Sequence, residues 1–199
     1  MATSMCVNEL PDELLSEVFA RLPSTERLSS RVPLLNLESN NLTCLPAALT
    51  SLTQLEELTL GDNVGLDLAL ATSVASTFSS LKHLDIGWIR CGVLPDWVLH
   101  VSTLTSLNIQ GNNLTALPNL QRLHKLQYLD LSWNWFNVFP QKALMTAKAL
   151  RTLSISDNEP LEFSENLSQW RKQIGMLSQE WIDRRPDDAA CASEQAGNP

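Results

Sequence analysis

Three histidines and the carboxylates near them are the residues of this chain that could perform acid–base chemistry. His83 and Asp85 are two positions apart, so a strand would place both side chains on one side, as an acid–base pair requires. His100 and His124 lie in other parts of the chain, and the sequence contains no HExxH, GxSxG or P-loop motif. We therefore predict no enzymatic activity, and we interpret His83 and Asp85 as part of a solvated binding surface.

The four cysteines do not have the spacing of a metal site, so we expect neither a metal nor a cofactor. The start of the sequence, MATSMCVNELPDE, has neither the basic nor the apolar region of a secretory signal. No stretch has the roughly 18 apolar residues of a membrane span. We expect a location in the cytoplasm or the nucleus and no membrane partner.

The charge balance is acidic, with 22 Asp and Glu against 14 Lys and Arg and a formal net charge of -8. Nucleic-acid binding needs clustered basic residues that displace counterions from phosphates. The composition therefore argues against nucleic acid as a partner. With 44% hydrophobic residues, the chain can still bury the core of one elongated domain.

Candidate binding residues must be positioned by the elements around them, and those elements repeat. In the stretch LTSLNIQGNNLTALP, residues 104–118, leucine or isoleucine occupies positions 104, 107, 109, 114 and 117, with Asn112 between them. This mixed spacing fits neither a helix nor a simple strand. Six copies begin at 32, 55, 81, 104, 126 and 150, with intervals of 23, 26, 23, 22 and 24 residues. A repeat of this length is typical of a solenoid.

Residues 32–163 closely resemble the leucine-rich repeat family, whose pattern is LxxLxLxxNxLxxLPxxLxxL. The resemblance implies an α/β fold with short parallel strands on a concave face and an irregular or helical convex side. Extracellular members commonly have a cysteine cluster beside the repeats, and this sequence has none. Helical caps are expected at both ends, because the terminal coils of a solenoid must be covered.

The spacing within one copy has a physical reason. Leu107 and Ile109 should face inward from a short strand, while Ser106, Asn108 and Gln110 face outward. The carboxamide of the Asn that follows should satisfy backbone groups buried between coils. Two copies depart from the pattern: Ile89 replaces the Asn of the third, and the second contains the extra segment 65–78. We expect the third copy to satisfy its buried backbone groups in another way.

An N-terminal segment, LPDELLSEVFARLP, resembles the opening of an F-box, the module that docks on the Skp adaptor of Skp–cullin–F-box ubiquitin ligases. The second half of that module is missing, since Val32 already begins the first repeat and no Trp precedes Trp88. Residues 8–31 therefore have two interpretations, an adaptor-binding segment or an amphipathic cap over the first coil. The residues that match the family are Leu10, Pro11, Leu14, Leu15, Val18, Phe19, Leu22 and Pro23.

The C-terminal segment 164–182 has apolar residues at steps of three and four, which predicts an amphipathic helix. This helix would either cap the last coil or bind a partner. Residues 183–199 are small and polar, so we expect disorder there.

Outward residues of successive strands should form columns across the concave face, and two columns are distinctive. The polar column consists of Asn36, Thr59, Asp85, Asn108, Asp130 and Ser154. The tryptophan column consists of Ser39, Asp62, Trp88, Gly111, Trp133 and Asp157.

Trp88 and Trp133 lie two coils apart in this column, with Gly111 between them. Strands repeat at about 4.8 Å, so we expect about 10 Å between the two tryptophans. They could hold a basic or apolar side chain of a protein partner, or they could pack over the rim of their own loops. The predicted partner-binding residues are His83, Asp85, Trp88, Asn108, Gln110, Tyr128, Asp130 and Trp133.

Two functions are compatible with this sequence. In the first, residues 8–31 bind the Skp adaptor and the concave face presents a protein for ubiquitination. In the second, the same residues only cap the solenoid, and the repeats form an intracellular scaffold or adaptor for signalling. Both predict a protein partner on the concave face.

Overall fold

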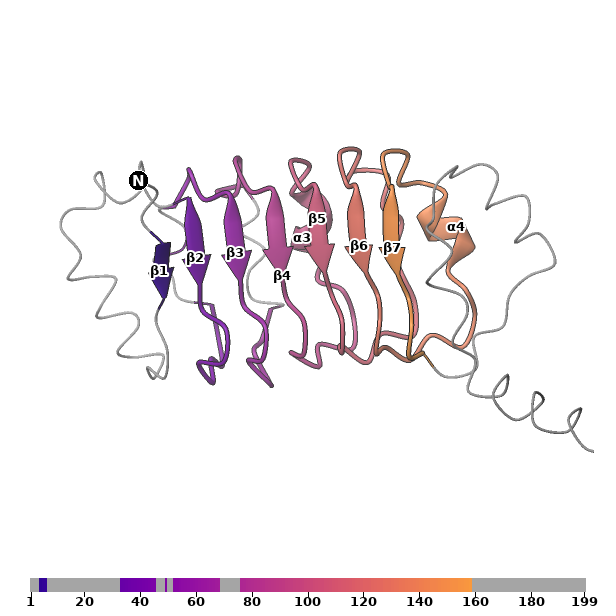
Figure 1. The fold of residues 1–199 in the computed structure, drawn as a ribbon, viewed down its shortest axis with the longest axis horizontal. Coiled ribbons are helices and arrows are strands. Elements are labelled where there is room, and N and C mark those ends of the chain that lie inside the picture. Colours follow the sequence, from indigo (N-terminus) through magenta and orange to yellow (C-terminus); the bar gives the residue numbers. More distant parts are fainter. Residues whose placement is uncertain (1–3, 7–32, 46–48, 50–51, 69–75, 159–199) are drawn as a thin grey trace, which may run out of the picture.

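The computed structural model of the chain describes residues 4–6, 33–45, 49, 52–68 and 76–158. Within these ranges it is a row of stacked coils, each contributing one short strand to a parallel sheet (Figure 1). The strands are β1 (Ser4–Cys6), β2 (Leu34–Asn36), β3 (Glu57–Thr59), β4 (His83–Asp85), β5 (Ser106–Asn108), β6 (Tyr128–Asp130) and β7 (Thr152–Ser154).

The strands follow one another in chain order, and each pairs in parallel with the next. The central residue of each strand lies opposite the central residue of its neighbour; Leu107, for example, pairs with Leu84 on one side and Leu129 on the other. This register places equivalent positions of the repeat side by side. The predicted solenoid of parallel strands is therefore confirmed.

Strand β1 was not expected from the sequence. It pairs in parallel with β2, and Met5 lies opposite Leu35. Met5 and Val7 have the spacing of the two strand leucines in other copies, but the interval from Ser4 to Leu34 is longer than the 22–26 residues between the later copies. Residues 8–31, which contain the F-box-like sequence, connect β1 to β2 along the chain and lie outside the described residues.

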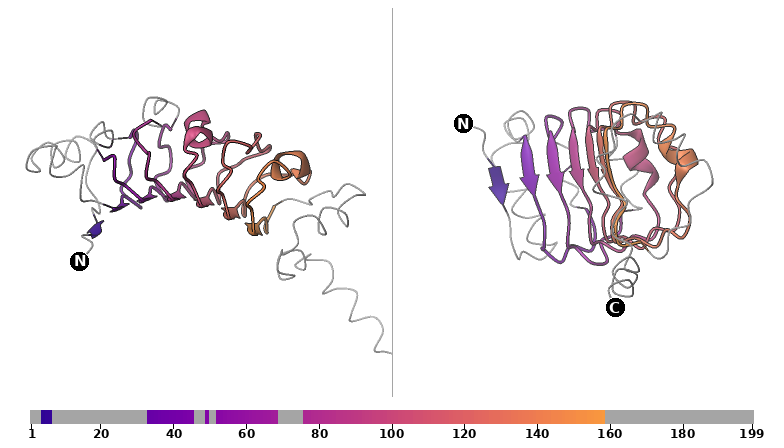
Figure 2. Two further views of the ribbon diagram at one scale, coloured as in Figure 1. Left: turned by 90° about the horizontal axis from the view of Figure 1, so that it is seen from above. Right: turned by 45° about the vertical axis from the view of Figure 1, so that its right-hand side comes forward.

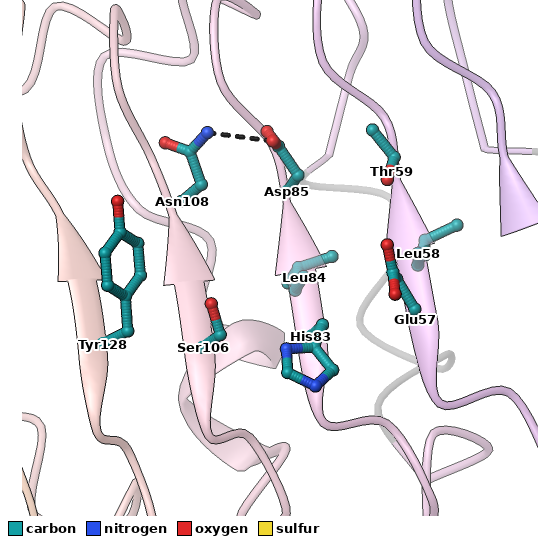
Figure 3. Close-up of a pocket in the computed structure, with 9 residues that line it drawn as sticks. All are labelled: Glu57, Leu58, Thr59, His83, Leu84, Asp85, Ser106, Asn108 and Tyr128. Carbon is teal, nitrogen blue, oxygen red and sulfur yellow. Dashed lines mark hydrogen bonds between the residues drawn. The ribbon is translucent and has the colours of Figure 1, made fainter. Parts of the chain in front are cut away.

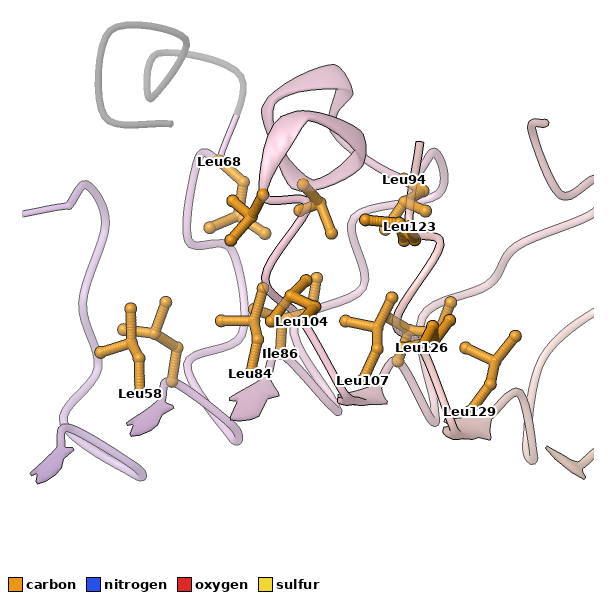
Figure 4. Close-up of a cluster of buried hydrophobic side chains, with 14 of the residues drawn as sticks. Leu58, Leu68, Leu84, Ile86, Leu94, Leu104, Leu107, Leu123, Leu126 and Leu129 are labelled. Atoms are coloured by element: carbon orange, nitrogen blue, oxygen red, sulfur yellow. The ribbon is translucent and has the colours of Figure 1, made fainter. Parts of the chain in front are cut away.

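The core is a continuous stack of leucines beneath the sheet (Figure 4). In β2–β7 the central residue is buried while its neighbours are partly or fully exposed. Leu107 and Ile109 are fully buried and Ser106, Asn108 and Gln110 are half-buried, as predicted. Each buried leucine contributes roughly 1.5–3 kcal/mol, but only because the next coil covers it.

Among the described residues, the convex side contains the short helices α3 (Asp96–His100) and α4 (Gln141–Leu144). Both follow the proline that ends a repeat motif, Pro95 or Pro140. Figure 2 (left) shows the strands along the concave side and these helices on the opposite side. Trp97 of α3 is buried, and its indole N–H donates to the Leu68 carbonyl oxygen at 3.1 Å. The expected helical caps, at residues 8–31 and 164–182, lie outside the described residues.

The repeat asparagine bonds to the backbone of two coils at four positions, as predicted. In Asn134, Oδ1 accepts from the amides of Asn112 and Leu114 in the preceding coil, at 3.1 and 2.9 Å. Its Nδ2 donates to the carbonyl oxygens of Ile109 and Leu131, both at 3.0 Å. These bonds satisfy polar groups that the leucine core would otherwise isolate from water. Related patterns occur at Asn63, Asn112 and Asn158.

The coil of Ile89 lacks this asparagine and uses its backbone instead. The amides of Ile89 and Cys91 donate to Asn112 Oδ1, as in a regular coil. Toward the preceding coil, the Ile89 carbonyl oxygen accepts from the Gly65 amide at 3.2 Å. The expectation that this coil satisfies its backbone groups in another way is confirmed for Gly65.

Candidate functional site

The concave face consists of four columns of residues from β2–β7 and the turns that follow them. Two are the polar column and the tryptophan column defined above. The strand-start column contains Leu34, Glu57, His83, Ser106, Tyr128 and Thr152. The turn column contains Glu38, Gly61, Gly87, Gln110, Ser132 and Ser156.

Backbone hydrogen bonds keep these columns aligned beyond the ends of the strands. The amide of a tryptophan-column residue donates to a turn-column carbonyl oxygen of the next coil. Trp88 thus donates to Gln110 at 2.8 Å, and Gly111 donates to Ser132 at 3.0 Å. The concave face is therefore a regular grid, on which neighbouring positions belong to successive coils.

Side chains of the polar column are held by their own backbone. One side-chain oxygen of Asp85 accepts from the Gly87 amide at 2.8 Å, and one of Asp130 accepts from the Ser132 amide at 2.9 Å. Asn108 accepts the Gln110 amide in the same way at 3.0 Å. This i to i+2 bond closes a turn at the strand end. It fixes the carboxylates in orientation and leaves their negative charge in place.

The second oxygen of each carboxylate has a neutral donor. Asp85 Oδ2 accepts from the side-chain Nδ2 of Asn108 at 2.9 Å, and Asp130 Oδ2 accepts from the Tyr128 hydroxyl at 3.2 Å. A shallow hollow of about 270 Å³ lies over this region and is lined mainly by β3, β4 and β5 (Figure 3). The pairs of oxygens and donors in and beside the hollow are thus preorganised for contacts with a polar ligand.

His83 and Asp85 are both in this hollow, but they are not an acid–base pair. The Asp85 carboxylate bonds to Gly87 and Asn108, and within the described residues it has no hydrogen bond or ion pair with His83. Figure 3 shows the imidazole at the start of β4, directed away from the carboxylate. The arrangement is that of a polar binding surface.

The carboxylates of the polar column act electrostatically on Tyr128. Burial raises the pKa of the Tyr128 phenol above its ordinary value, and the negative charge and hydrogen bond of Asp130, together with the charge of Asp85, raise this pKa further. Both effects favour the neutral phenol over the phenolate.

The four columns contain acidic but no basic residues of the Lys or Arg type between β2 and β7. Lys82 precedes β4 at the edge of the face and forms an ion pair with Glu56 at 2.8 Å. Among the described residues, no ion pair neutralises the carboxylates on the columns. They are Glu38, Glu57, Asp62, Asp85, Asp130 and Asp157.

The tryptophan column has a left-handed backbone at each of its positions. The φ angles are 57° at Trp88, 68° at Gly111 and 55° at Trp133, and Ser39, Asp62 and Asp157 have similar values. This conformation suits glycine and small polar residues and is unfavourable for bulky ones. Tryptophan is therefore an unusual occupant at these two positions.

Trp88 and Trp133 contact each other across Gly111. Their ring centroids are 6.0 Å apart with an angle of 44° between the ring planes. A Cβ atom on Gly111 would lie 2.4 Å from the Trp88 ring, so this ring covers the glycine backbone. The expected separation of about 10 Å is wrong for the side chains, because the Trp88 ring lies over Gly111 in the space that the glycine leaves open. Trp88 remains 41% exposed and Trp133 52% exposed.

The structure brings the eight predicted concave residues onto one face. Sequence reasoning did not include Glu38 or Glu57 among them, nor the flanking Asp62 and Asp157, although both aspartates belong to the tryptophan column. A search of every column for charge would have found all four. The predicted adaptor-binding residues, from Leu10 to Pro23, lie outside the described residues.

In the part of the chain that the structure describes, no helix has the length and apolarity that a bilayer span requires. Within the same ranges, no three side chains of the metal-binding types converge.

Comparison with known proteins supports the repeat fold. Residues 102–161 match the family model described as "Leucine rich repeat". The solved structure of an internalin C2 from Listeria monocytogenes matches with a TM-score of 0.65 and 16% identity, over 84% of this chain and 70% of that one. At this identity the likeness shows the fold alone. Residues 102–161 thus carry leucine-rich repeats, and the described part of the chain has the parallel-strand solenoid of the leucine-rich repeat fold.

Curated relatives share the repeats but are very different proteins. Podocan-like protein 1 of Mus musculus is 32% identical over 152 residues, which is 73% of this chain and 26% of that protein. Toll-like receptor 6 of Mus musculus is 27% identical over 111 residues, covering 56% of this chain and 14% of the receptor. Leucine-rich repeat serine/threonine-protein kinase 1 of Mus musculus is 30% identical, over 69% of this chain and 7% of the kinase. The chain thus spans only a small part of these relatives.

Proposed function

We propose that this chain is a protein-interaction module that binds a partner protein across its concave face. The observation that carries the proposal is the grid of polar, charged and aromatic side chains held in register over the leucine core. Solenoids of this kind use such extended concave surfaces for binding. Carboxylates without basic partners and two exposed tryptophans provide groups that a complementary protein surface would contact.

A pair of matched substitutions tests the location of binding. Ser106→Arg places a long side chain in the middle of the concave face, whereas Ala116→Arg places it at an exposed position outside the four columns. Proteins that bind the full chain, quantified by mass spectrometry, should be lost with Ser106→Arg and retained with Ala116→Arg. Equal retention by both variants would contradict binding on the concave face.

The more specific function that we propose is that of a substrate receptor for a Skp–cullin–F-box ubiquitin ligase, acting in the cytoplasm or the nucleus. Its support is the resemblance of residues 10–23 to the F-box opening, with two prolines and six apolar residues at the positions of that family. In this function the N-terminal segment binds the Skp adaptor, and the concave face holds the protein to be ubiquitinated.

A second candidate, a scaffold without adaptor binding, is favoured by strand β1. Since β1 pairs with β2 in the register of the repeats, residues 8–31 connect two neighbouring strands of the sheet. The returning segments of the other coils have this same topological place, and they contribute residues to the shared core. In this function the apolar residues of the segment would cover the first coils.

Mixing the purified chain with the Skp adaptor distinguishes the two candidates. A complex at micromolar concentration, abolished by Leu14→Asp with an unchanged melting temperature, would support the receptor. No complex with the parent chain, together with a clear loss of thermal stability in Leu14→Asp, would support the scaffold, because a buried carboxylate disrupts a core.

A further inference from the structure

We propose that the partner contributes an arginine-containing segment that lies on the concave face, with a guanidinium group stacked on Trp88 or Trp133. The proposal rests on the proposed function of the concave face and adds the chemistry of the bound segment. The binding surface consists of four carboxylates around the two tryptophans. Asp62 and Asp157 lie in the tryptophan column, and Asp85 and Asp130 lie in the polar column.

The charge of the surface determines the sign of its partner. Asp85 and Asp130 are half-buried and bonded only to neutral donors within the described residues. Within the described residues, neither carboxylate forms an ion pair with a basic side chain. A neutral or acidic segment would remove water from these carboxylates without replacing its hydrogen bonds, which is unfavourable. A basic segment supplies both charge and donors.

The tryptophans determine which basic side chain fits best. The left-handed region is unfavourable for a bulky residue, because its Cβ crowds the neighbouring carbonyl oxygen. Trp88 and Trp133 have this conformation, while the same column elsewhere has serine, aspartate and glycine. Their rings are not buried in the leucine core, so packing in the core does not account for them. A role in binding does.

Arginine combines the two requirements. Its planar guanidinium stacks on an indole face while its N–H groups remain free to donate to carboxylates at the edge of the ring. Lysine has a compact, strongly hydrated charge and gains less from stacking. The tilt of 44° between the two indoles leaves the outer ring faces differently oriented, so that a guanidinium has a choice of two platforms next to aspartates.

A random peptide library selected on the full chain provides the test. We expect the selected peptides to be enriched in arginine and to lose affinity as the salt concentration rises, since charge pairs of this kind are screened. Replacing arginine by lysine in a selected peptide should weaken binding several-fold, and replacing it by glutamine should weaken binding at least tenfold.

Substitutions in the protein assign the binding energy to the surface. The double variant Trp88→Ser, Trp133→Ser introduces a residue that the same column already accepts at Ser39, so the fold should be retained. We expect a loss of affinity of roughly tenfold or more, and a few-fold loss for Asp62→Asn or Asp157→Asn. Trp135→Ser, at another exposed tryptophan, and Asp96→Asn, on the convex side, are the matched controls and should bind as the parent does.

The possible results separate this inference from the proposed function. Selected peptides without basic residues, or basic peptides that bind equally to the double tryptophan variant, would overturn the arginine site. If the Ser106→Arg variant nevertheless fails to bind these peptides, the proposal of binding on the concave face stands. If every selected peptide binds the Ser106→Arg variant as tightly as the parent chain, both proposals fail.

Discussion

At the scale of single residues, Gly111 determines how the two tryptophans meet. It has a φ of 68°, and its missing side chain leaves the space that the Trp88 ring occupies. Two separate penalties therefore oppose any larger residue at this position. One is the left-handed backbone, and the other is overlap with the indole.

Gly111→Ala should lower the free energy of unfolding by about 2 kcal/mol or more, from about 1–2 kcal/mol of backbone strain plus the overlap with the ring. Adding Trp88→Ser should restore the part that comes from overlap and leave the backbone part. Denaturant unfolding of the two single variants and the double variant measures this coupling. Strictly additive effects would mean that the Trp88 ring does not rest on Gly111 in solution.

Tyr128 reports the electrostatics of the concave face. The pKa of its phenol lies above the ordinary value of about 10 because burial and the charges of Asp130 and Asp85 disfavour the phenolate. Asp130→Asn should lower this pKa, since it removes the nearest negative charge. Phenolate absorbance during an alkaline titration provides the measurement, and an unchanged titration in Asp130→Asn would contradict the assignment.

The same shift has a consequence for stability. Because the folded pKa is raised, the unfolded chain loses its proton first as the pH increases. The stabilisation that the neutral Tyr128 phenol contributes to the folded state is therefore complete below a pH of about 10. It is lost as the pH rises from the unfolded to the folded pKa of this phenol. The melting temperature of Tyr128→Phe should fall less steeply than that of the parent in this alkaline range.

At the scale of elements, the asparagines at 63, 112, 134 and 158 connect their own turns to the coils before them. Asn134 makes bonds in both directions, whereas Asn40 donates to the Glu38 carbonyl oxygen at 2.9 Å and its buried Oδ1 has no partner within the described residues. The two residues thus have the same place in the repeat and different numbers of bonds. They form a natural pair for comparison.

Asn134→Ala should lower the free energy of unfolding by roughly 3 kcal/mol or more, because several buried backbone groups lose their partners at about 1–3 kcal/mol each. Asn40→Ala should cost only about 1 kcal/mol, the value of one ordinary hydrogen bond. Thermal or denaturant unfolding compares them. Equal losses would indicate that Asn40 has partners in solution beyond those described.

The repeat elements could be predicted from sequence because their leucines and asparagines are determined by local geometry. Leu107, Ile109 and Asn112 occupy the predicted sites, and each makes the contact with a neighbouring coil that the repeat pattern implies. Strand β1 could not be recognised, because Met5 and Val7 replace leucines and the following interval is long. The contact between Trp88 and Trp133 was also missed, since it depends on side-chain directions that strand spacing does not determine.

At the scale of the whole molecule, stability is a sum over coils and over the contacts between neighbours. The coils of Asn112, Asn134 and Asn158 form an uninterrupted run of asparagine bonds. The run is broken at Ile89, where the link to the preceding coil at Gly65 is made by the backbone. The interface between the coils of Gly65 and Ile89 should therefore open more readily than those that follow it.

Hydrogen exchange can locate this weaker interface. Amides of β6 should exchange at least several-fold more slowly than amides of β3, because local opening is easier where fewer buried bonds connect the coils. Exchange measured by mass spectrometry on peptides from each coil gives the profile. Uniform protection from β3 to β7 would show that the missing asparagine does not weaken the array.

The regular register also sets how the distance between the two indoles can change in evolution. Insertions within a coil, such as the extra segment of the second copy, leave the sheet in register. The number of strands between the two indoles changes only by complete coils, so this spacing changes in increments of about 4.8 Å. A single extra coil beside Gly111 would separate the rings beyond contact, and a single deletion would place them on adjacent coils. The contact between the two tryptophans therefore tolerates sequence change within a coil but not a change in the number of coils between them.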